Sequence, residues 1–264
     1  MCAIHGFCWP SEEKINEMLC EAHHRGPDGS DKWISDDITL GHNLLSIVDT
    51  VENGKQPFYY EDLILVYNGE IYNSKALKTE LLENNADFVW RGHSDTEVLL
   101  AGFDFWGIEQ TVRKSEGMFA MAVWDRQLNE LSLIRDRMGE KPLYYGWIPQ
   151  KECFAFSSDL IFDKLFRGIS FDLNEDALND LFHLNFINNN YSIFKNIFKV
   201  EPGSYLEVKF KKNQIPTINT YKYWKLENLN IAKNISKNDN STVELDHKLT
   251  EIVKNQIFAD VEVG

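Results

Sequence analysis

Residues 117–136 read GMFAMAVWDRQLNELSLIRD, which is two apolar runs joined by a polar turn. The runs at 117–125 and 131–136 are typical of half-buried β-strands, and the five residues between them favour a hairpin. The segments PLYYGWI at 142–148 and ECFAFSS at 152–158 have the same character, and we expect them to extend the same sheet. This part of the chain therefore predicts an antiparallel sheet.

Towards the N-terminus, strand-like and helical patterns alternate. Extended segments are expected at 2–9, at 63–68, and on both sides of the Asp36-Asp37 turn between Lys32 and Val48. Helices are expected over four segments that each begin with a polar residue: Ser11–His24, Ser74–Asn84, Ser94–Trp106 and Asn174–Asn185. Helices among so many strands favour an α+β fold, in which layers of helix pack on antiparallel sheet.

Composition restricts the class of protein. The 264 residues, 43% of them hydrophobic, suffice for one large domain or two modest ones. A formal net charge of −14 disfavours nucleic acid as a partner. The sequence has neither a membrane-length apolar run nor the pattern of a secretory signal, so we expect a cytoplasmic protein without a membrane partner.

The cysteines and histidines do not indicate a metal site. Cys2, Cys8, Cys20 and Cys153 lack paired spacing, and the seven histidines have no partner ligands at metal spacing. We therefore expect free thiols and no bound metal.

The chain changes character after about Gly168. Residues 203–224 resemble a hairpin around Lys211-Lys212-Asn213, and residues 227–242 are rich in Asn, Lys and Ser, as exposed linkers are. A further helix is expected to begin near Val243.

Cys2 follows Met1 directly, and this position carries the first chemical indication. Removal of Met1 would put a thiol and a free α-amine on one residue. An α-amine titrates at about 7.7–8.0 and can take the proton of a thiol whose pKa is about 8.5, which makes a self-contained nucleophile and base. The simpler interpretation is that Cys2 is a small second residue that only permits removal of Met1. The rest of the chain must decide between this interpretation and a catalytic role.

A series of segments in fixed order decides in favour of chemistry. They are Met1-Cys2-Ala3-Ile4, HRGPDG at 24–29, LGH at 40–42, LSIVD at 45–49, NGEIYN at 68–73, SDTEVLL at 94–100, EGMFA at 116–120, WD at 124–125 and RDRMGEKPLYY at 135–145. Together they resemble the glutaminase domain of the class II glutamine amidotransferases, whose nucleophile is N-terminal, and the asparagine synthetase family in particular. The resemblance covers nearly all of residues 2–165.

The resemblance implies a fold and a domain organisation. The fold is the four-layer αββα sandwich of the N-terminal nucleophile hydrolases. A glutaminase domain would span residues 2–165, a connecting region that completes it 166–226, a linker 227–242, and the first helix of a truncated synthetase domain 243–264. DVEVG at 260–264 is similar to the stretch that precedes the family's ATP-binding loop, and the loop itself does not follow. We interpret this as a truncated piece of a longer protein or an interrupted reading frame, and expect no cofactor in this chain, with ATP and Mg²⁺ needed only by the absent synthetase domain.

The resemblance also implies catalytic residues. Cys2 would be the nucleophile, and Asn68 and Gly69 would supply two donors to the oxyanion that forms on the attacked amide. Arg25 and Asn73 would be supporting residues. Simpler interpretations exist, because Asn-Gly is a common turn pair and Arg25 begins a loop that ends a helix.

Four further residues would bind the substrate. Backbone groups of Ile47 and Val48 would complete the glutamine site, although their side chains by themselves indicate only core. Glu70 and Asp95 would face the substrate's ammonium. Their simpler roles are a turn residue and a first-turn helix carboxylate.

One position departs from the family. An arginine usually precedes the Leu-Ser-Ile-Val segment and clamps the α-carboxylate of glutamine, but here the residue is Leu44. Loss of such charge-assisted bonds costs roughly 1.5–3 kcal/mol, about ten- to a hundredfold in affinity. Asn43 or Arg91 could compensate.

The sequence thus predicts an enzyme that hydrolyses L-glutamine to glutamate and ammonia through a Cys2 thioester. Ammonia would normally pass to an ATP-dependent synthetase domain that makes asparagine or a related amide, and the partner would be a homodimer mate or a separate synthetase domain. The main alternative is a catalytically impaired regulatory or binding domain, for which Leu44 is the evidence. A third hypothesis delivers the ammonia to a sugar or a peptide side chain.

Overall fold

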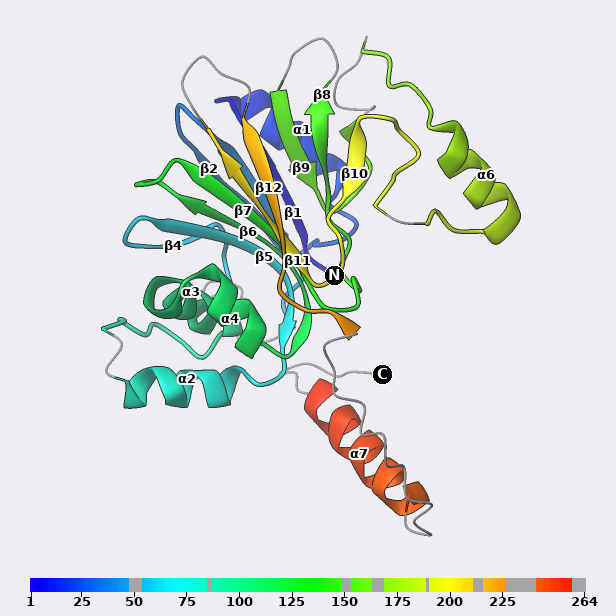
Figure 1. The fold of residues 1–264 in the computed structure, drawn as a ribbon. Coiled ribbons are helices and arrows are strands. Elements are labelled where there is room, and N and C mark those ends of the chain that lie inside the picture. Colours follow the sequence, from blue (N-terminus) through cyan, green and yellow to red (C-terminus); the bar gives the residue numbers. More distant parts are fainter. Residues whose placement is uncertain are drawn as a thin grey trace.

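Two six-stranded antiparallel sheets form the centre of the molecule (Figure 1). The computed structural model describes residues 1–47, 54–84, 87–148, 153–162, 169–188, 190–210, 216–226 and 241–257. The first sheet has the strand order β10-β8-β9-β1-β3-β2, and the second has the order β12-β11-β7-β6-β5-β4.

The strands lie close to the predicted segments. Those of the first sheet are β1 (Ala3–Phe7), β2 (Gly29–Ile34), β3 (Thr39–Leu44), β8 (Tyr144–Ile148), β9 (Cys153–Ser157) and β10 (Ile197–Lys199). Those of the second are β4 (Phe58–Tyr60), β5 (Leu63–Ile71), β6 (Gly117–Asp125), β7 (Glu130–Arg135), β11 (Ser204–Lys209) and β12 (Thr217–Lys222). The hairpin predicted for 203–224 is the antiparallel pair β11 and β12, while its turn at 211–213 falls outside the described residues.

One prediction about the sheets is wrong. The segments 142–148 and 152–158 do not extend the sheet of the 117–136 hairpin, because β8 and β9 belong to the first sheet and β6 and β7 to the second. The chain crosses between the sheets after Arg135. Buried Asp136 organises the crossing: its carboxylate accepts from the backbone N–H groups of Met138, Glu140 and Lys141, each at 3.0 Å. An apolar pattern indicates that a segment is a strand but not which strand it will pair with.

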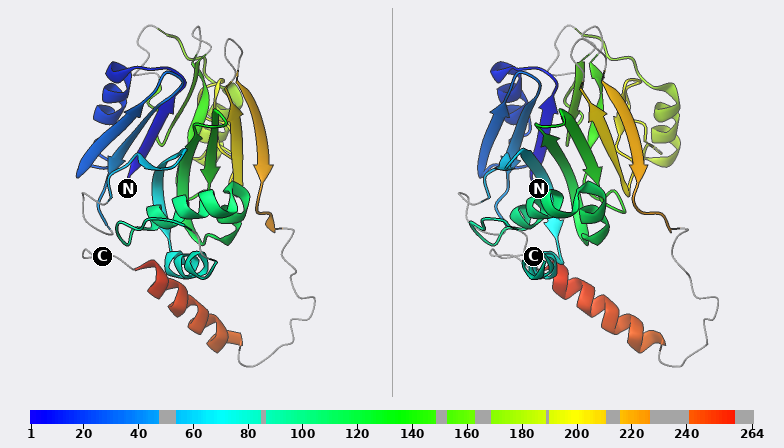
Figure 2. Two further views of the ribbon diagram at one scale, coloured as in Figure 1. Left: turned by 90° about the vertical axis from the view of Figure 1, so that its left-hand side faces the viewer. Right: turned by 60° about the vertical axis from the view of Figure 1, so that its left-hand side comes forward.

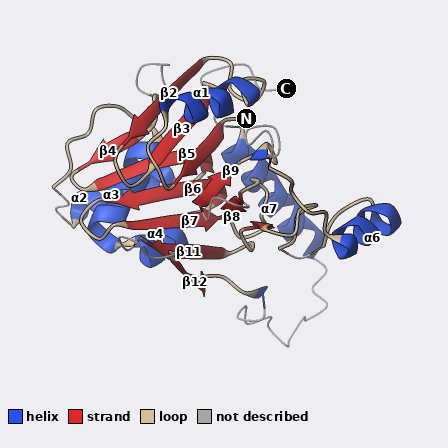
Figure 3. Ribbon diagram, turned by 90° about the horizontal axis from the view of Figure 1, so that it is seen from above, coloured by secondary structure: helices blue, strands red, loops and turns tan. Residues whose placement is uncertain are grey.

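Helices from the first half of the chain cover the outer faces of the two sheets, which confirms the α+β class and the αββα layering (Figures 1 and 3). The first sheet is covered by α1 (Glu12–Glu21), whose Ile15, Met18 and Leu19 pack in one cluster with residues of β1 and β9. On the second sheet lie α2 (Ser74–Glu83), α3 (Asp95–Trp106) and α4 (Ile108–Lys114).

Local capping explains where the predicted helices begin. The hydroxyl oxygens of Ser11 and Ser94 accept from Lys14 N–H and Thr96 N–H, and the Asn174 side chain caps α6 (Glu175–Leu184) in the same way. Helix α1 ends three residues before the predicted His24, and α4 was not predicted. Gly107, with φ of 79°, separates α3 from α4. A seven-residue helix that follows at once gives too short a periodic pattern to recognise.

A buried apolar layer holds the two sheets together. Ile4 and Leu40 of the first sheet meet Val66 and Ala122 of the second within one cluster of buried side chains. Burial of this size, at about 25 cal/mol per Å² of apolar surface, is the main favourable term for the fold. The layer positions the N-terminus of β1 beside the ends of β3 and β5.

Two buried histidines in the first sheet link it to the site. The Nε2–H of His42 donates to the Tyr67 carbonyl of the second sheet at 3.2 Å, and His5 contacts Ser157 Oγ at 2.9 Å. Burial lowers the pKa of His42 to about 4 and that of His5 to about 3, so both rings are neutral at neutral pH. They hold the strands and do not act as acids.

The C-terminal part ends in the helix α7 (Ser241–Gln256), which begins two residues before the predicted Val243. Figure 2 shows α7 away from the sheets, with its C-terminal end beside α2. The predicted linker falls almost wholly on residues 227–240, outside the described residues. In the described ranges, none of the helices combines the length and apolar character that crossing a bilayer requires.

Candidate functional site

Cys2 lies immediately before β1, at the point where both sheets end. The Leu45 N–H donates to its Sγ at 3.3 Å, and the thiol in turn donates to the Leu45 carbonyl at 3.6 Å. Burial raises the pKa of the thiol, and the Leu45 N–H opposes this rise. Met1 is 53% exposed, and its amine donates to the Arg25 carbonyl at 3.1 Å.

The residues predicted to act together line one cavity of about 90 Å³. Its lining includes Cys2, Ile47, Asn68, Gly69, Glu70 and Asp95. They come from positions far apart in the chain. The pairing of β1 with β3 joins the strand after Cys2 to the strand before Ile47, and the packing of Ile4 against Val66 sets β1 against β5 of the other sheet.

Asn68 contributes a hydrogen-bond donor that the resting protein leaves unused. The residue is 1% exposed, and its Nδ2 has no acceptor among the described residues. A buried amide without a partner costs roughly 1–3 kcal/mol, so such a group indicates a site for a ligand atom. An oxygen that gains negative charge in the cavity would satisfy it.

Gly69 is required by the close approach of the neighbouring strand. A Cβ at this position would lie 2.2 Å from the Met118 carbonyl oxygen and 2.7 Å from Phe119 Cα, both of them backbone atoms of β6. Only glycine therefore lets β5 and β6 pair here and keeps the backbone of residue 69 against the cavity.

Asp95 and Glu70 form the negatively charged end of the cavity. The Tyr67 hydroxyl and the Ile71 N–H donate to one oxygen of Asp95 at 2.8 and 2.9 Å. Burial raises the pKa of Asp95, and burial followed by repulsion from Asp95 raises that of Glu70. Two carboxylates that repel each other in a low-dielectric cavity are relieved by a cationic ligand, and a substrate ammonium is one.

Sequence reasoning did not single out Tyr67 and Gln56, which support this end of the cavity. Gln56 is 5% exposed, and its Oε1 accepts from the Tyr67 N–H at 2.6 Å. Tyr67 thereby holds its hydroxyl against Asp95. The place of Tyr67 just before Asn-Gly is a signal that could have been used, whereas nothing local marks Gln56.

The backbone groups of Ile47 and Val48 are predicted to complete the glutamine site, and the structure describes only the first of these residues. Ile47 lines the cavity, but its side chain is 39% exposed, so the interpretation of this side chain as core is wrong. Ile47 follows the end of β3 and belongs to none of the apolar clusters that the described residues form. Val48 falls outside the described residues.

Arg25 and Asn73 lie beside the cavity and hold the backbone around it. Arg25 Nε donates to the Cys2 carbonyl at 3.3 Å, and its Nη1 pairs with Asp159 at 3.0 Å. Asn73 donates to the Lys114 carbonyl and accepts from the Glu116 N–H, both at 2.9 Å. Arg25 thus anchors the nucleophile's main chain, and Asn73 joins the start of α2 to the start of β6.

Leu44 lines the cavity at 7% exposure, and neither residue expected to compensate for it does so. The Asn43 amide donates to the Leu19 carbonyl at 3.0 Å, in the interior of the first sheet. Arg91 lies over the rings of Phe58 and Tyr59. Lys141 is instead the one lysine or arginine among the described residues of the lining.

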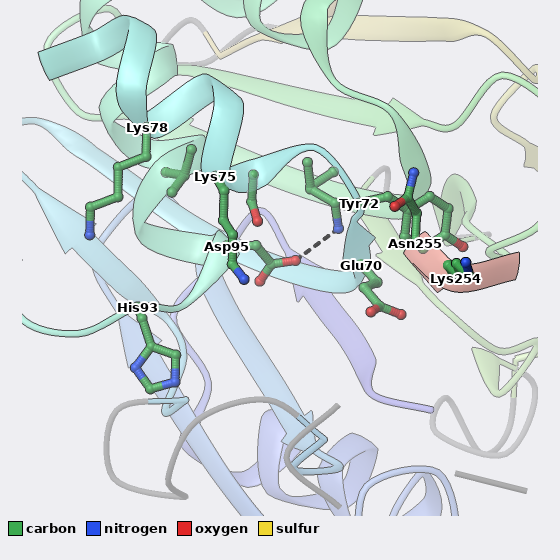
Figure 4. A pocket seen from close by; sticks show the side chains of 11 residues that line it. Glu70, Tyr72, Lys75, Lys78, His93, Asp95, Lys254 and Asn255 are labelled. Carbon is green, nitrogen blue, oxygen red and sulfur yellow. Dashed lines mark hydrogen bonds between the residues drawn. The ribbon is translucent and has the colours of Figure 1, made fainter. Parts of the chain in front are cut away.

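A second cavity, of about 270 Å³, lies on the other side of the two carboxylates (Figure 4). Glu70 and Asp95 line both cavities, and the second is also lined by Lys75, Lys78 and His93. Figure 4 shows the bond from the Ile71 N–H that fixes Asp95 between them. The lysines Lys75 and Lys78 therefore line the cavity on this side of the carboxylate pair.

Comparisons with known proteins agree with this geometry. The model of the glutamine amidotransferase domain family matches residues 1–224. Among curated proteins, the chain is 34% identical to a putative glutamine-hydrolysing asparagine synthetase 2 of Methanocaldococcus jannaschii, over 100% of the chain and 54% of that protein. It is 30% identical to the glutamine-hydrolysing asparagine synthetase 3 of Bacillus subtilis, over 100% of the chain and 42% of that protein. The chain thus spans about half the length of the curated relatives it matches.

Solved structures show the same fold. An allosteric regulatory enzyme of purine biosynthesis matches with a TM-score of 0.60 at 17% identity, over 84% of this chain and 49% of that one. The glutamine phosphoribosylpyrophosphate amidotransferase of Bacillus subtilis matches with a TM-score of 0.59 at 16% identity, over 85% of this chain and 49% of that one.

Proposed function

Because the chain belongs to the class II glutamine amidotransferase family, we propose that it hydrolyses the side-chain amide of L-glutamine to glutamate and ammonia. The nucleophile is Cys2 after removal of Met1. The observation that carries the proposal is the buried Asn68 amide, which has no acceptor among the described residues and lines the same cavity as the Cys2 thiol.

The first half of the reaction forms a thioester. The α-amine of Cys2 takes the thiol proton, and the thiolate attacks the amide carbon, so that a C–S bond forms and the carbonyl electrons move to the oxygen. Asn68 Nδ2 and the Gly69 N–H donate to that oxygen. The α-ammonium then gives its proton to the amide nitrogen, the C–N bond breaks, and ammonia leaves.

The second half regenerates the enzyme. The α-amine takes a proton from water, and the hydroxide adds to the thioester carbon. The same donors hold the second oxyanion. The C–S bond breaks, Cys2 recovers its proton from the α-ammonium, and glutamate is released.

The substrate's ammonium is bound by Asp95 and Glu70. Support comes from the raised pKa of both carboxyl groups, which burial causes in each and to which repulsion from Asp95 adds at Glu70. A cation bound beside them stabilises their charged forms. Tyr67 keeps Asp95 in place through the 2.8 Å bond from its hydroxyl.

The names of the relatives support a proposal for the fate of the ammonia. Those compared above are named glutamine-hydrolysing asparagine synthetases, and we propose that ammonia released here is used to make asparagine or a related amide. That step needs ATP and Mg²⁺ at a synthetase site beyond the glutaminase cavity. Glutamine hydrolysis at Cys2 needs neither.

The proposed function is tested on the purified chain. Intact-mass measurement is expected to show that Met1 is absent, and a coupled assay is expected to show release of glutamate from L-glutamine. A diazoketone analogue of glutamine should label Cys2, as peptide mapping would show. A protein that lacks Met1 but neither releases glutamate nor takes the label would overturn the proposal.

Restoring the family's arginine is expected to tighten glutamine binding. In Leu44→Arg the guanidinium can reach the cavity that Leu44 now lines and pair with the substrate carboxylate. The apparent KM for glutamine should fall roughly ten- to a hundredfold, with kcat changed little. Steady-state kinetics measure both quantities.

The matched control for this substitution is Leu44→Met, which keeps an apolar side chain of similar volume. Its KM should stay at the wild-type value. If Leu44→Arg leaves KM unchanged as well, the substrate carboxylate is held from another side of the cavity.

A further inference from the structure

Lys141 is a buried lysine in the crossing between β7 and β8. Its N–H donates to Asp136 at 3.0 Å, and its carbonyl accepts from Arg135 Nε at 2.9 Å. The residue is 6% exposed and lines the cavity that contains Cys2. The backbone is therefore fixed at two points, and the side chain extends to the reactive site.

The ammonium of Lys141 has no counter-charge within ion-pair distance among the described residues, and none of them accepts a hydrogen bond from it. Burial of an unpaired ammonium is costly, and proteins retain such groups where an anion forms or binds. Burial lowers the pKa of Lys141, and Cys2 is the first of the negative groups that oppose this. The Cys2 thiolate is thus the anion that fits this ammonium.

We propose that Lys141 is a positioning residue whose ammonium stabilises the Cys2 thiolate and so raises the fraction of enzyme ready for attack. The inference rests on the proposed function, in which the thiolate is the nucleophile. It assigns to Lys141 a role that the oxyanion donors and the α-amine do not fill. An opposite charge in a low-dielectric cavity stabilises a thiolate without entering the reaction.

Other titratable groups act on Cys2 or Lys141, and none of them replaces Lys141. They are the N-terminal amine, Arg25 from the loop after α1, Asp28 beyond it, Tyr67 and Glu70 from β5, Asp95 from α3, and Asp136 and Glu140 from the crossing between β7 and β8. The carboxylates disfavour the thiolate. Arg25 favours it but is neutralised by the 3.0 Å ion pair with Asp159. Of the two side-chain cations, Lys141 is the one that lacks such a pair among the described residues.

The cation acts on the base as well as on the nucleophile. A positive charge beside the α-amine of Cys2 disfavours its protonated form, so more of the amine is free to accept the thiol proton. The ammonium thus favours both the thiolate and the neutral α-amine, and each of these forms is then present at lower pH. Lys141 therefore extends the reactive range of the site towards lower pH.

The test is the rate at which iodoacetamide alkylates Cys2 as a function of pH, in protein that lacks Met1. Peptide mass spectrometry reads the modification at Cys2 alone. In Lys141→Met the acidic limb of the profile should move to higher pH by about one unit, because the thiolate loses its cation. Lys141→Arg should keep the wild-type limb, since the charge remains.

The matched control is Lys199→Met. Lys199 is also partly buried, its Nζ donates to the Ile187 carbonyl at 2.8 Å, and it does not line the cavity. Its replacement should leave the alkylation profile unchanged. If Lys141→Met does not fold, Lys141→Gln takes its place with the same expected shift.

A wild-type alkylation profile in the variant without the charge overturns the inference. If the KM for glutamine rises in the same variant, the ammonium faces the substrate carboxylate instead. Failure of the proposed function is a separate result, because wild-type protein would then release no glutamate while the alkylation profile could still be measured.

Discussion

Replacing Cys2 with alanine is expected to reduce glutamate release from glutamine by roughly 10⁴-fold or more, because the thioester cannot form. Among the described residues that line the cavity, Cys2 supplies the only thiol. Fold stability should change little, since the thiol's bonds are the weak ones to Leu45 at 3.3 and 3.6 Å. The coupled glutamate assay, together with thermal unfolding, separates the two effects.

Cys8→Ala is the control for the loss of a thiol as such. Cys8 follows the other end of β1, where its Sγ accepts from the Phe154 N–H at 3.1 Å. This variant should retain activity within about twofold of the wild type. Cys2→Ala protein that releases glutamate at the wild-type rate would show that Cys2 is not the nucleophile.

Predictions that depend on local chemistry agree with the structure. Ser11, Ser94 and Asn174 begin helices because each side chain can accept from a backbone N–H two or three residues later, and this needs no knowledge of the rest of the fold. The strands of the two hairpins are equally local, since alternation of apolar residues and a turn suffice. Such elements can be predicted from neighbouring residues alone.

Predictions that depend on pairing partners are less secure. The 142–148 and 152–158 segments form strands as expected but join the first sheet, because the loop built around Asp136 sends the chain across the sandwich. Three backbone N–H groups of that loop converge on one buried carboxylate. The pattern of apolar residues in the sequence does not indicate that these N–H groups meet at Asp136.

In the candidate site, too, some residues could be predicted from sequence motifs and others only from the three-dimensional arrangement. Cys2, Asn68 and Asp95 were predicted from ordered motifs, and the structure places them around one cavity. Gln56 lies outside those motifs, whereas Lys141 lies within RDRMGEKPLYY at 135–145 but was not assigned a role. Only the three-dimensional arrangement shows that both residues reach the cavity.

Replacing Asn68 with alanine is expected to lower kcat by about 10²–10³-fold, equivalent to about 2.7–4 kcal/mol, with a smaller change in KM. The Nδ2 group lacks an acceptor among the described residues, so its bond forms when the oxyanion does. An interaction made only in the transition state changes kcat. Removing an unused buried donor also costs the fold little, and the melting temperature should not fall.

Asn73→Ala is the contrasting variant, because the same amide there is fully engaged. It bonds to the Lys114 carbonyl and the Glu116 N–H, both at 2.9 Å, and its loss should reduce the free energy of unfolding by about 1–3 kcal/mol. Its kcat should remain near the wild-type value. Two asparagines five positions apart would then have opposite effects, one on the rate and one on stability. A variant at Asn68 that melts early and keeps its kcat would instead assign that amide to the fold and leave the oxyanion with other donors.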